Sequence, residues 1–246
     1  MNISYSIVIP VYKSETIIPD TISQVISAMD DLSEPYEVIL VNDGSPDGAW
    51  SVIKGLAEKY NSVVAINLIK NYGQHNAVHS GFAHAKGSYI ITMDDDLQNP
   101  PSELKHLINK IKNSEYDLVF GKFREKKHAA HRRMGSKIIG YLNKKVFKKP
   151  DNITLTNFRI VKREVIERVL RHKTPYPYIP GLLLLYASNV GNVFVEHHER
   201  DVGSSNYTLP KILSLVSRLL INYSSYPLRL LSRADIWYRC SLVSCV

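Results

Sequence analysis

Three consecutive aspartates at positions 94–96 are the residues with the clearest chemical potential in the sequence. They directly follow an apolar run, Tyr89 to Met93, that has the composition of a buried strand. Adjacent carboxylates raise one another's pKa and are costly together unless a cation neutralises them. Oxygen ligands at the mouth of a pocket suit Mg2+ or Mn2+, which often join a protein carboxylate to substrate phosphates. The alternative is a cap for a helix that begins at Pro100 or Pro101, and a cap accounts for only one aspartate.

A second acidic turn, Asp43-Gly44-Ser45, follows the apolar run that ends at Val41. A carboxylate in a tight turn is suited to hydrogen bonds with a nucleobase or a ribose. Alternatively, Ser45 or Asp47 caps the helix predicted in the following segment, GAWSVIKGLAEKY. The residues by themselves leave both interpretations open.

Both turns need a sheet that brings the ends of separate strands together. Strand-like apolar runs occur at Ser6–Val11, Tyr36–Val41, Val63–Leu68, Tyr89–Met93 and Asp117–Phe120, with helical spacing between them. This order predicts an α/β fold with a mostly parallel sheet and helices on both faces. Ligands of such sheets bind at the carboxyl ends of the strands. The polar stretches PVYKSE, NDGSPDG, KNYGQ and DDDLQNPP follow four of these runs and therefore predict a single site.

The composition limits the class of protein and of partner. A chain of 246 residues with 44% hydrophobic and 22% charged residues can form one large ordered domain. A net charge of +8 indicates an anionic partner, which can be nucleic acid, a nucleotide or an acidic membrane surface. The two cysteines, Cys240 and Cys245, have no metal-like spacing and fit a reducing, cytosolic setting. No apolar window reaches the roughly 18 residues of a membrane span, so we expect no membrane-crossing segment in this chain.

Four motifs together resemble those of the family 2 glycosyltransferases with a GT-A fold. They are SIVIPVYKSE, VNDGSPDG, KNYGQHNAVHSGFAHAKGSYIITMDDDLQNPP and TNFRIVKRE. The resemblance is strongest to the branch that contains dolichol-phosphate mannose synthase and the bacterial polyprenyl-phosphate glycosyltransferases. It covers roughly Ser4 to Leu230. It implies an inverting, hexosyltransferase-type transfer from a nucleoside diphosphate sugar, with Mg2+ or Mn2+ on the diphosphate.

The resemblance also implies roles for the residues at the first four strand ends. The nucleotide pocket would be formed by Pro10, Tyr12 and Glu15 at its rim and by Asp43 and Asp94 on the nucleobase side. Asp96, supported by Gln98, would hold the metal. Side chains at positions 94 and 96 of an extended segment point the same way, so both can face one diphosphate and Asp95 points elsewhere. Asn42 stands where the family often has aspartate, which leaves the base specificity open.

The basic segment from Gly121 to Lys149 is the candidate acceptor region. It fits a solvated helix face, a nucleic-acid patch, or a phosphate and membrane-surface site. In the resembled branch, the acceptor's lipid phosphate would be held by Arg124, Arg133 and Ser136, which together with Asp96 form the predicted catalytic set. Asn157 and Arg159 fall on the predicted acceptor-side wall, with Arg159 a candidate phosphate contact. A phosphate nucleophile is already ionised at neutral pH, so no general base is required.

The segment VFVEHHERDVGSSNYTLPKILSL predicts a strand ending at Arg200, a loop, and an amphipathic helix from about Thr208. The resemblance implies that five residues close over the donor diphosphate as a lid: Arg200, Gly203, Ser205, Tyr207 and Lys211. We therefore expect a GT-A catalytic domain at residues 1–207. Residues 208–246 would form an amphipathic helix and tail at the membrane surface, without the transmembrane helices that often follow in relatives.

Three functions remain open from the sequence. The leading one is transfer of a sugar to polyprenyl phosphate by a cytoplasmic enzyme peripheral to the inner face of the cell membrane. The second is transfer to a hydroxyl of a lipid-linked glycan during surface polysaccharide assembly. The third, a basic nucleic-acid binding protein, leaves the acidic cluster at residues 94–96 unexplained, and we expect no nucleic-acid partner. The sugar, the base and the oligomeric state do not follow from the sequence.

Overall fold

The computed structural model describes residues 3–123, 140–141, 143–197 and 209–224. The chain divides into two compact units, residues 1–127 with 149–203 and residues 128–148 with 204–246. The first unit contains the whole described sheet. In the second unit, residues 143–147 are helical, and α8 spans Leu209–Tyr223. Within the described residues, no helix is both long enough and apolar enough to span a membrane.

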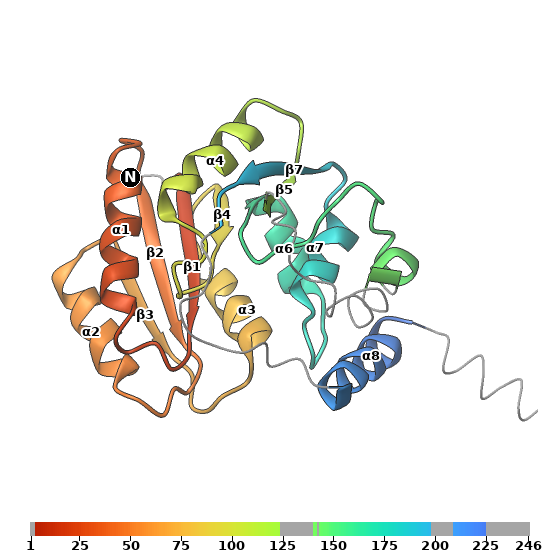
Figure 1. The fold of residues 1–246 in the computed structure, drawn as a ribbon, viewed down its shortest axis with the longest axis horizontal. Coiled ribbons are helices and arrows are strands. Elements are labelled where there is room, and N and C mark those ends of the chain that lie inside the picture. The colour runs from red at the N-terminus through yellow and green to blue at the C-terminus, as the bar shows by residue number, and fades with distance from the viewer. Residues whose placement is uncertain (1–2, 124–139, 142, 198–208, 225–246) are drawn as a thin grey trace, which may run out of the picture. The chain divides into compact units, whose positions relative to one another are not determined.

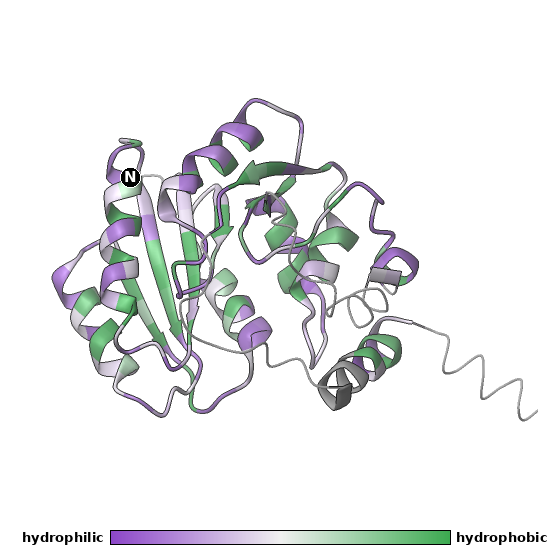
Figure 2. Ribbon diagram, viewed as in Figure 1, coloured by the Kyte–Doolittle hydropathy of each residue, from purple (hydrophilic) through white to green (hydrophobic). Residues whose placement is uncertain are grey.

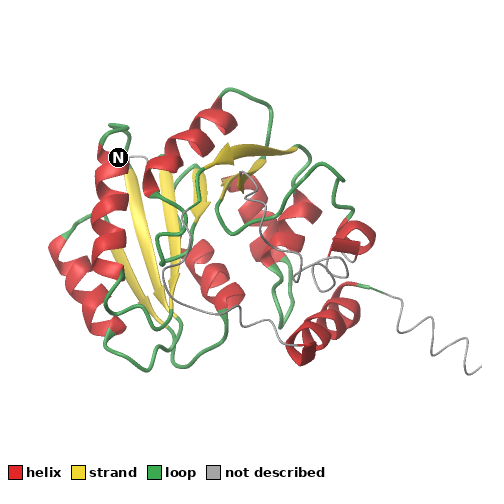
Figure 3. Cartoon of the chain, in the orientation of Figure 1, coloured by secondary structure: helices red, strands yellow, loops and turns green. Residues whose placement is uncertain are grey.

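The sheet of the first unit has seven strands in the order β3-β2-β1-β4-β6-β5-β7 (Figures 1 and 3). Their bounds are β1 Tyr5–Val11, β2 Tyr36–Asn42, β3 Val63–Asn67, β4 Tyr89–Thr92, β5 Leu118–Phe123, β6 Arg159–Lys162 and β7 Val190–Val195. All neighbours pair in parallel except β6, which runs antiparallel to both β4 and β5. The predicted α/β fold with a mostly parallel sheet is confirmed.

Helices cover both faces of this sheet. Their bounds are α1 Ile18–Asp30, α2 Ala49–Lys59, α3 Gln74–His84, η1 Pro101–Glu103, α4 Leu104–Lys112, α6 Arg163–Arg171 and α7 Ile179–Tyr186. Alternate side chains of β1, such as Ile7 and Ile9, enter one core with apolar residues of α1, α2 and α4. The opposite face is covered by α3, which packs on β1 and β2, and by α6 and α7. The central strands are accordingly hydrophobic along most of their length (Figure 2).

The strand predicted to end at Arg200 is shorter than expected, because β7 ends at Val195. The next backbone N–H, that of Glu196, donates to a Glu103 carboxylate oxygen at 3.0 Å instead of continuing the ladder. The ring of His197 then stacks on Phe123, with 4.2 Å between ring centroids. The helix predicted from about Thr208 is confirmed, since α8 begins at Leu209.

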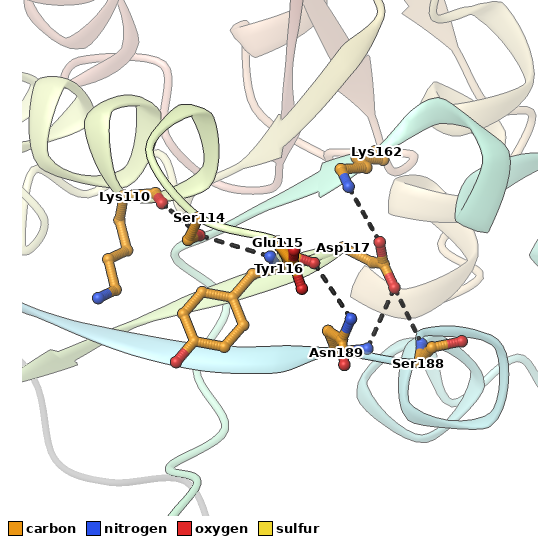
Figure 4. A network of polar contacts seen from close by, with 8 residues as sticks. All are labelled: Lys110, Ser114, Glu115, Tyr116, Asp117, Lys162, Ser188 and Asn189. Carbon is orange, nitrogen blue, oxygen red and sulfur yellow. Dashed lines mark hydrogen bonds and ion pairs between the residues drawn. The ribbon is translucent and has the colours of Figure 1, made fainter.

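A polar network around Asp117 joins three strands at the edge of the sheet where β5 and β7 begin (Figure 4). One carboxylate oxygen accepts from Lys162 Nζ at 3.1 Å, at the end of β6. The other accepts from the backbone N–H groups of Ser188 and Asn189, each at 3.1 Å. Partial burial raises the pKa of Asp117, but the hydrogen bonds from Asn189, Lys162 and Ser188 outweigh it and lower the pKa overall. The network therefore stabilises the frame as long as this carboxylate is ionised.

We predict that Asp117→Ala lowers the free energy of unfolding by about 1–2 kcal/mol at pH 7, because three donors lose a charged acceptor. Since the folded-state pKa is depressed, the stabilisation is fully present above the ordinary aspartate pKa of about 4. It is lost as the pH falls below that value, so wild type and variant should converge in acid. Urea denaturation across pH 2–7 measures this. Glu115→Ala is the matched control, because Glu115 enters the network through its backbone carbonyl; an equal loss there would contradict the assignment.

At the opposite, carboxyl edge, the loop after β2 packs against the loop after β3. Gly44 has a φ of +59°, a region that favours glycine. A Cβ atom at this position would lie 2.3 Å from the carbonyl carbon of Lys70 and 2.5 Å from the backbone nitrogen of Asn71. Backbone cannot give way as a flexible side chain can, so the two loops can be this close only because residue 44 is glycine.

We therefore expect Gly44→Ala to lower the melting temperature clearly, at a cost of at least about 1 kcal/mol from the backbone conformation alone. Gly55→Ala in α2 is the control, because a Cβ there meets nothing within 4 Å. That change should be neutral or stabilising by up to about 1 kcal/mol, as alanine is the better helix former. Thermal denaturation of both variants decides the matter, and equal melting temperatures would refute the close packing of the two loops.

Candidate active site

The site is built at the carboxyl edge of the first unit, where β1, β2 and β4 run in parallel and β4 ends at Thr92, opposite Val8 of β1. Val11 at the end of β1 lies opposite Asn42 at the end of β2. The segments that follow these strands hold most of the residues singled out in the sequence. The sheet thus brings together positions that are up to about eighty residues apart along the chain, as expected for an α/β fold.

The side chains of Asp94 and Asp95 turn in different directions. The Asp95 carboxylate accepts hydrogen bonds from Ser14 Oγ and, at 3.4 Å, from the backbone N–H of Tyr12. Its own backbone carbonyl accepts from Thr21 Oγ1 at 2.9 Å. Burial raises the pKa of Asp95 to about 6, although the bonds from Ser14 and Tyr12 lower it, and the neighbouring carboxylates add to the rise. Asp95 therefore ties the end of β4 to the β1–α1 loop.

Asp94 faces the other side, toward α3 and β6. Its Oδ1 accepts from Gln74 Nε2 at 2.5 Å and from Asn157 Nδ2 at 3.3 Å. Burial and the charge of Asp96 raise its pKa, while Asn157, the Arg159 charge and Gln74 act against the rise. The predicted divergence of Asp95 from Asp94 is confirmed by these separate sets of partners.

Asp96 and Gln98 form a tight, half-buried turn. Asp96 Oδ1 accepts the backbone N–H of Gln98 at 3.2 Å, and Leu97 between them has a positive φ of 57°. The helix that follows has Pro100 at its N-cap and no side-chain cap, so the capping alternative for the aspartates is wrong. Next to the turn, the buried Oδ1 atom of Asn99 has no hydrogen-bond partner among the described residues. Carboxylate and amide oxygens in this turn fit the oxygen ligands that Mg2+ and Mn2+ prefer.

The described residues contain no group of three or more His, Cys, Asp or Glu side chains that could hold a metal ion. Two oxygens from Asp96 and Gln98 would leave most positions of a six-coordinate ion to other ligands. Phosphate oxygens of a bound nucleotide are ligands of this kind.

The predicted rim residues lie on β1 and the loop that follows it. Pro10 is buried within β1, opposite Val41. The Tyr12 side chain is 42% exposed, with Lys13 Nζ 5.5 Å from its ring centroid. Glu15 accepts the Gly48 backbone N–H at 2.9 Å and so supports the turn before α2. Of the three, Tyr12 and Glu15 are exposed, and Tyr12 offers an aromatic ring to a ligand.

Asp43 and Asp47 hold the neighbouring loops. The Asp43 side chain is 3% exposed, and its two oxygens accept the backbone N–H groups of Tyr72 at 2.7 Å and Gly73 at 2.9 Å. Burial raises the pKa of Asp43 and these two bonds lower it, with a net rise. Asp47 accepts from Ser45 Oγ at 2.5 Å and from Ala49 N at 3.3 Å. Gly48 is the N-cap residue of α2 and no side chain caps this helix, so the capping interpretation is wrong for Ser45 and Asp47, although Asp47 accepts the Ala49 N–H from outside the helix.

Arg159 is buried, whereas the sequence predicted that it contacts the acceptor phosphate. Its side chain is 1% exposed, so it is no surface contact for an acceptor phosphate. Burial lowers the pKa of Arg159 to about 10, against the opposing effect of Asp94, and the group stays charged at neutral pH. Burial of the His75 ring lowers its pKa to about 4, and the nearby charge of Arg159 adds to this effect. Sequence reasoning missed His75, since a histidine in a helical stretch carries no signal of which face it will occupy.

The remaining predicted residues fall outside the described residues. These are Arg124, Arg133 and Ser136 of the acceptor set and Arg200, Gly203, Ser205 and Tyr207 of the lid. The same holds for the side chain of Lys211, at the start of α8. Their roles stay predictions.

Comparison with known proteins identifies the family. The model of "Glycosyl transferase family 2" matches residues 6–170. A relative from Shewanella sediminis, named undecaprenyl-phosphate 4-deoxy-4-formamido-L-arabinose transferase, is 37% identical over 237 residues, which cover 94% of this chain and 70% of the relative. The protein of the same name from Serratia proteamaculans is 35% identical over 228 residues, which cover 92% of this chain and 70% of that relative.

Solved structures agree on the fold. Glucosyl-3-phosphoglycerate synthase from Mycobacterium tuberculosis, in complex with Mn2+, UDP and phosphoglyceric acid, superposes with a TM-score of 0.64 at 18% identity, over 89% of this chain and 76% of that one. S. aureus TarS 1-349 gives a TM-score of 0.56 at 17% identity, over 89% of this chain and 64% of that one. The family match, the two relatives and the acidic carboxyl edge lead to one conclusion: this chain belongs to glycosyl transferase family 2 and is a glycosyltransferase.

Proposed function

We propose that this glycosyltransferase moves a sugar from a nucleoside diphosphate sugar to polyprenyl phosphate. The observation that carries the proposal is the 34–37% identity, over more than nine tenths of the chain, to relatives named as undecaprenyl-phosphate transferases. Family membership favours this enzyme function over the basic nucleic-acid binding protein. The test is direct: purified protein, undecaprenyl phosphate and a panel of nucleotide sugars should yield a lipid-linked sugar. Product formed only with a lipid-linked glycan would favour the second function, transfer to a hydroxyl.

The donor nucleotide would lie over the ends of β1 and β2, with Tyr12 against it. Asp43 supports this pocket by fixing the backbone at residues 72 and 73, Glu15 supports the turn before α2, and Pro10 belongs to β1. Asp94 lies between this pocket and the start of β6, where it accepts a hydrogen bond from Asn157. UDP is the first nucleotide to try, because the synthase from M. tuberculosis binds it on the same fold.

Asp96 and Gln98 would hold Mg2+ or Mn2+ against the donor diphosphate. When bound, such an ion acts as a Lewis acid on the leaving diphosphate, whose negative charge grows as the glycosidic bond breaks. Asp95 is committed to Ser14 and the Tyr12 backbone, so it keeps the turn in place and takes no ligand role.

The acceptor would be bound by the basic residues Arg124 and Arg133 together with Ser136. Guanidinium groups match phosphate oxygens in geometry and charge. A phosphate oxygen of the lipid attacks the anomeric carbon as the bond to the diphosphate breaks, with inversion, and the nucleoside diphosphate leaves. We further propose that Arg200, Ser205, Tyr207 and Lys211 close over the donor and exclude water. A lipid acceptor places the enzyme at the membrane surface, on the side where nucleotide sugars are available.

We expect Asp96→Ala to abolish turnover and to weaken Mn2+-dependent UDP binding by at least about tenfold, since it removes the charged oxygen of the metal turn. Calorimetric titration with UDP, with and without Mn2+, measures the effect. Asp95→Asn is the matched control, because an amide can keep an acceptor for Ser14 and leaves the metal turn unchanged. Retained metal-dependent binding in Asp96→Ala would refute the role of Asp96.

Arg133→Ala should raise the KM for undecaprenyl phosphate about tenfold or more and leave the KM for the nucleotide sugar within about twofold. Steady-state kinetics with each substrate varied in turn gives both values. Arg168→Ala, which removes an exposed arginine from α6, is the control for a general loss of positive charge. An equal change in both KM values would argue against acceptor binding by Arg133.

A further inference from the structure

The loop between β1 and α1 is held by side chains from the loop between β2 and α2. The backbone N–H of Lys13 donates to Ser45 Oγ at 2.7 Å. The backbone N–H of Glu15 donates to Asp47 Oδ2 at 3.2 Å. One bond runs in the opposite direction, because the Glu15 carboxylate accepts the Gly48 N–H at 2.9 Å. Two side chains of the second loop therefore fix two backbone groups of the first.

Ser45 and Asp47 form one hydrogen-bonded pair that is anchored to the sheet. The Ser45 hydroxyl donates to Asp47 Oδ1 at 2.5 Å and accepts the Lys13 N–H with an oxygen lone pair. The Ser45 backbone N–H donates to Asn42 Oδ1 at 3.3 Å, at the end of β2. The Asn42 amide donates in turn to Asn67 Oδ1 at 2.7 Å, at the end of β3. The pair thus links the β1–α1 loop to the ends of two strands.

The backbone of Lys13 needs such support. Its φ is 59°, in the left-handed region that residues other than glycine rarely adopt. In this conformation Lys13 Nζ lies 5.5 Å from the ring centroid of Tyr12. From the other side, the Asp95 carboxylate accepts the Tyr12 N–H at 3.4 Å and the Ser14 hydroxyl. The short loop is therefore held between the segments that follow β2 and β4.

The side chain whose place depends on this loop is Tyr12. This step rests on the proposed function, in which the donor nucleotide lies against the Tyr12 ring. Because Tyr12 is 42% exposed, packing fixes its ring only in part, and the backbone at residues 12 and 13 must do the rest. A contact surface that is fixed beforehand binds more tightly, since less conformational freedom is lost on binding.

We propose that Ser45 and Asp47 are positioning residues for nucleotide binding, which hold the Lys13 backbone and, through it, the Tyr12 ring. In this role neither side chain needs to contact the nucleotide. Their loss lowers the affinity for the nucleotide and leaves the rate of the chemical step at saturating donor unchanged.

Calorimetric titration in the presence of Mn2+ tests this role, with whichever of UDP, GDP and dTDP the wild-type protein binds. Ser45→Ala should weaken the nucleotide about 3- to 10-fold. It should raise the KM for the nucleotide sugar to a similar extent and leave kcat within about twofold. Ser45→Thr keeps a hydroxyl and should recover most of the affinity. Asp47→Asn, a milder change in the same pair, should weaken the nucleotide in the same direction.

Ser114→Ala is the matched control. The Ser114 hydroxyl also joins two backbone groups, since it donates to the Lys110 carbonyl at 2.6 Å and accepts the Tyr116 N–H at 3.4 Å (Figure 4). It lies at the opposite edge of the sheet, before β5. Its loss should lower only the melting temperature and leave the nucleotide affinity unchanged.

A double-mutant cycle tests whether Ser45 acts through Tyr12. Tyr12→Ala removes the ring and should itself weaken the nucleotide at least about threefold. In that background Ser45→Ala should cost less than about a further twofold, because no ring remains to be positioned. Losses that add in full would show that Ser45 acts by another route and would overturn the positioning role. A fall in kcat in place of the rise in KM would overturn it as well.

The outcomes separate this inference from the proposed function. Wild-type protein that binds none of UDP, GDP and dTDP with Mn2+ would overturn the donor site itself. Nucleotide binding that Tyr12→Ala leaves unchanged would keep the donor site and overturn the Tyr12 contact, and with it this inference. Binding that is weakened by Tyr12→Ala but unchanged in Ser45→Ala would leave the proposed function intact and overturn the role of Ser45 alone.

Discussion

Three neighbouring carboxylates at the end of one strand form the constraint on which this site depends. Their mutual repulsion forbids them to share one environment, and the fold separates them. Asp95 is turned into the β1–α1 loop, where Ser14 binds it. Asp94 is turned toward β6, where an amide and a buried cation compensate it. Asp96 remains in a half-buried turn with Gln98, and it is the one whose position suits a divalent cation.

The loops around this turn are held by backbone hydrogen bonds to two acidic side chains, buried Asp43 and exposed Glu15. Asp43 binds two successive N–H groups of the loop after β3, and Glu15 binds the N–H that precedes α2. Gly44 permits the close approach of the first two loops. Much of the acidic character of the carboxyl edge thus serves to fix the backbone. In the proposed function, these loops would hold the donor diphosphate in one geometry.

The antiparallel strand β6 has a particular part in this arrangement. It carries Arg159 beneath the acidic turn, and at its other end Lys162 joins the Asp117 network (Figure 4). β6 therefore connects the far edge of the sheet with the site. Because it runs against its neighbours, it brings Asn157, from the segment before it, to the carboxyl ends of the parallel strands.

The sequence by itself determined the fold class, the first strands and the family, because alternating apolar runs and the motif around residues 94–96 are local patterns. It also predicted that the side chains of Asp95 and Asp94 point in different directions, since side chains alternate along an extended segment. Only the tertiary structure decided that Asp43 binds backbone, that Arg159 is buried, and that His75 lies beside it. These facts depend on contacts between residues distant in sequence. A buried cation and a surface cation look alike in the sequence, because burial is set by what the rest of the chain packs against them.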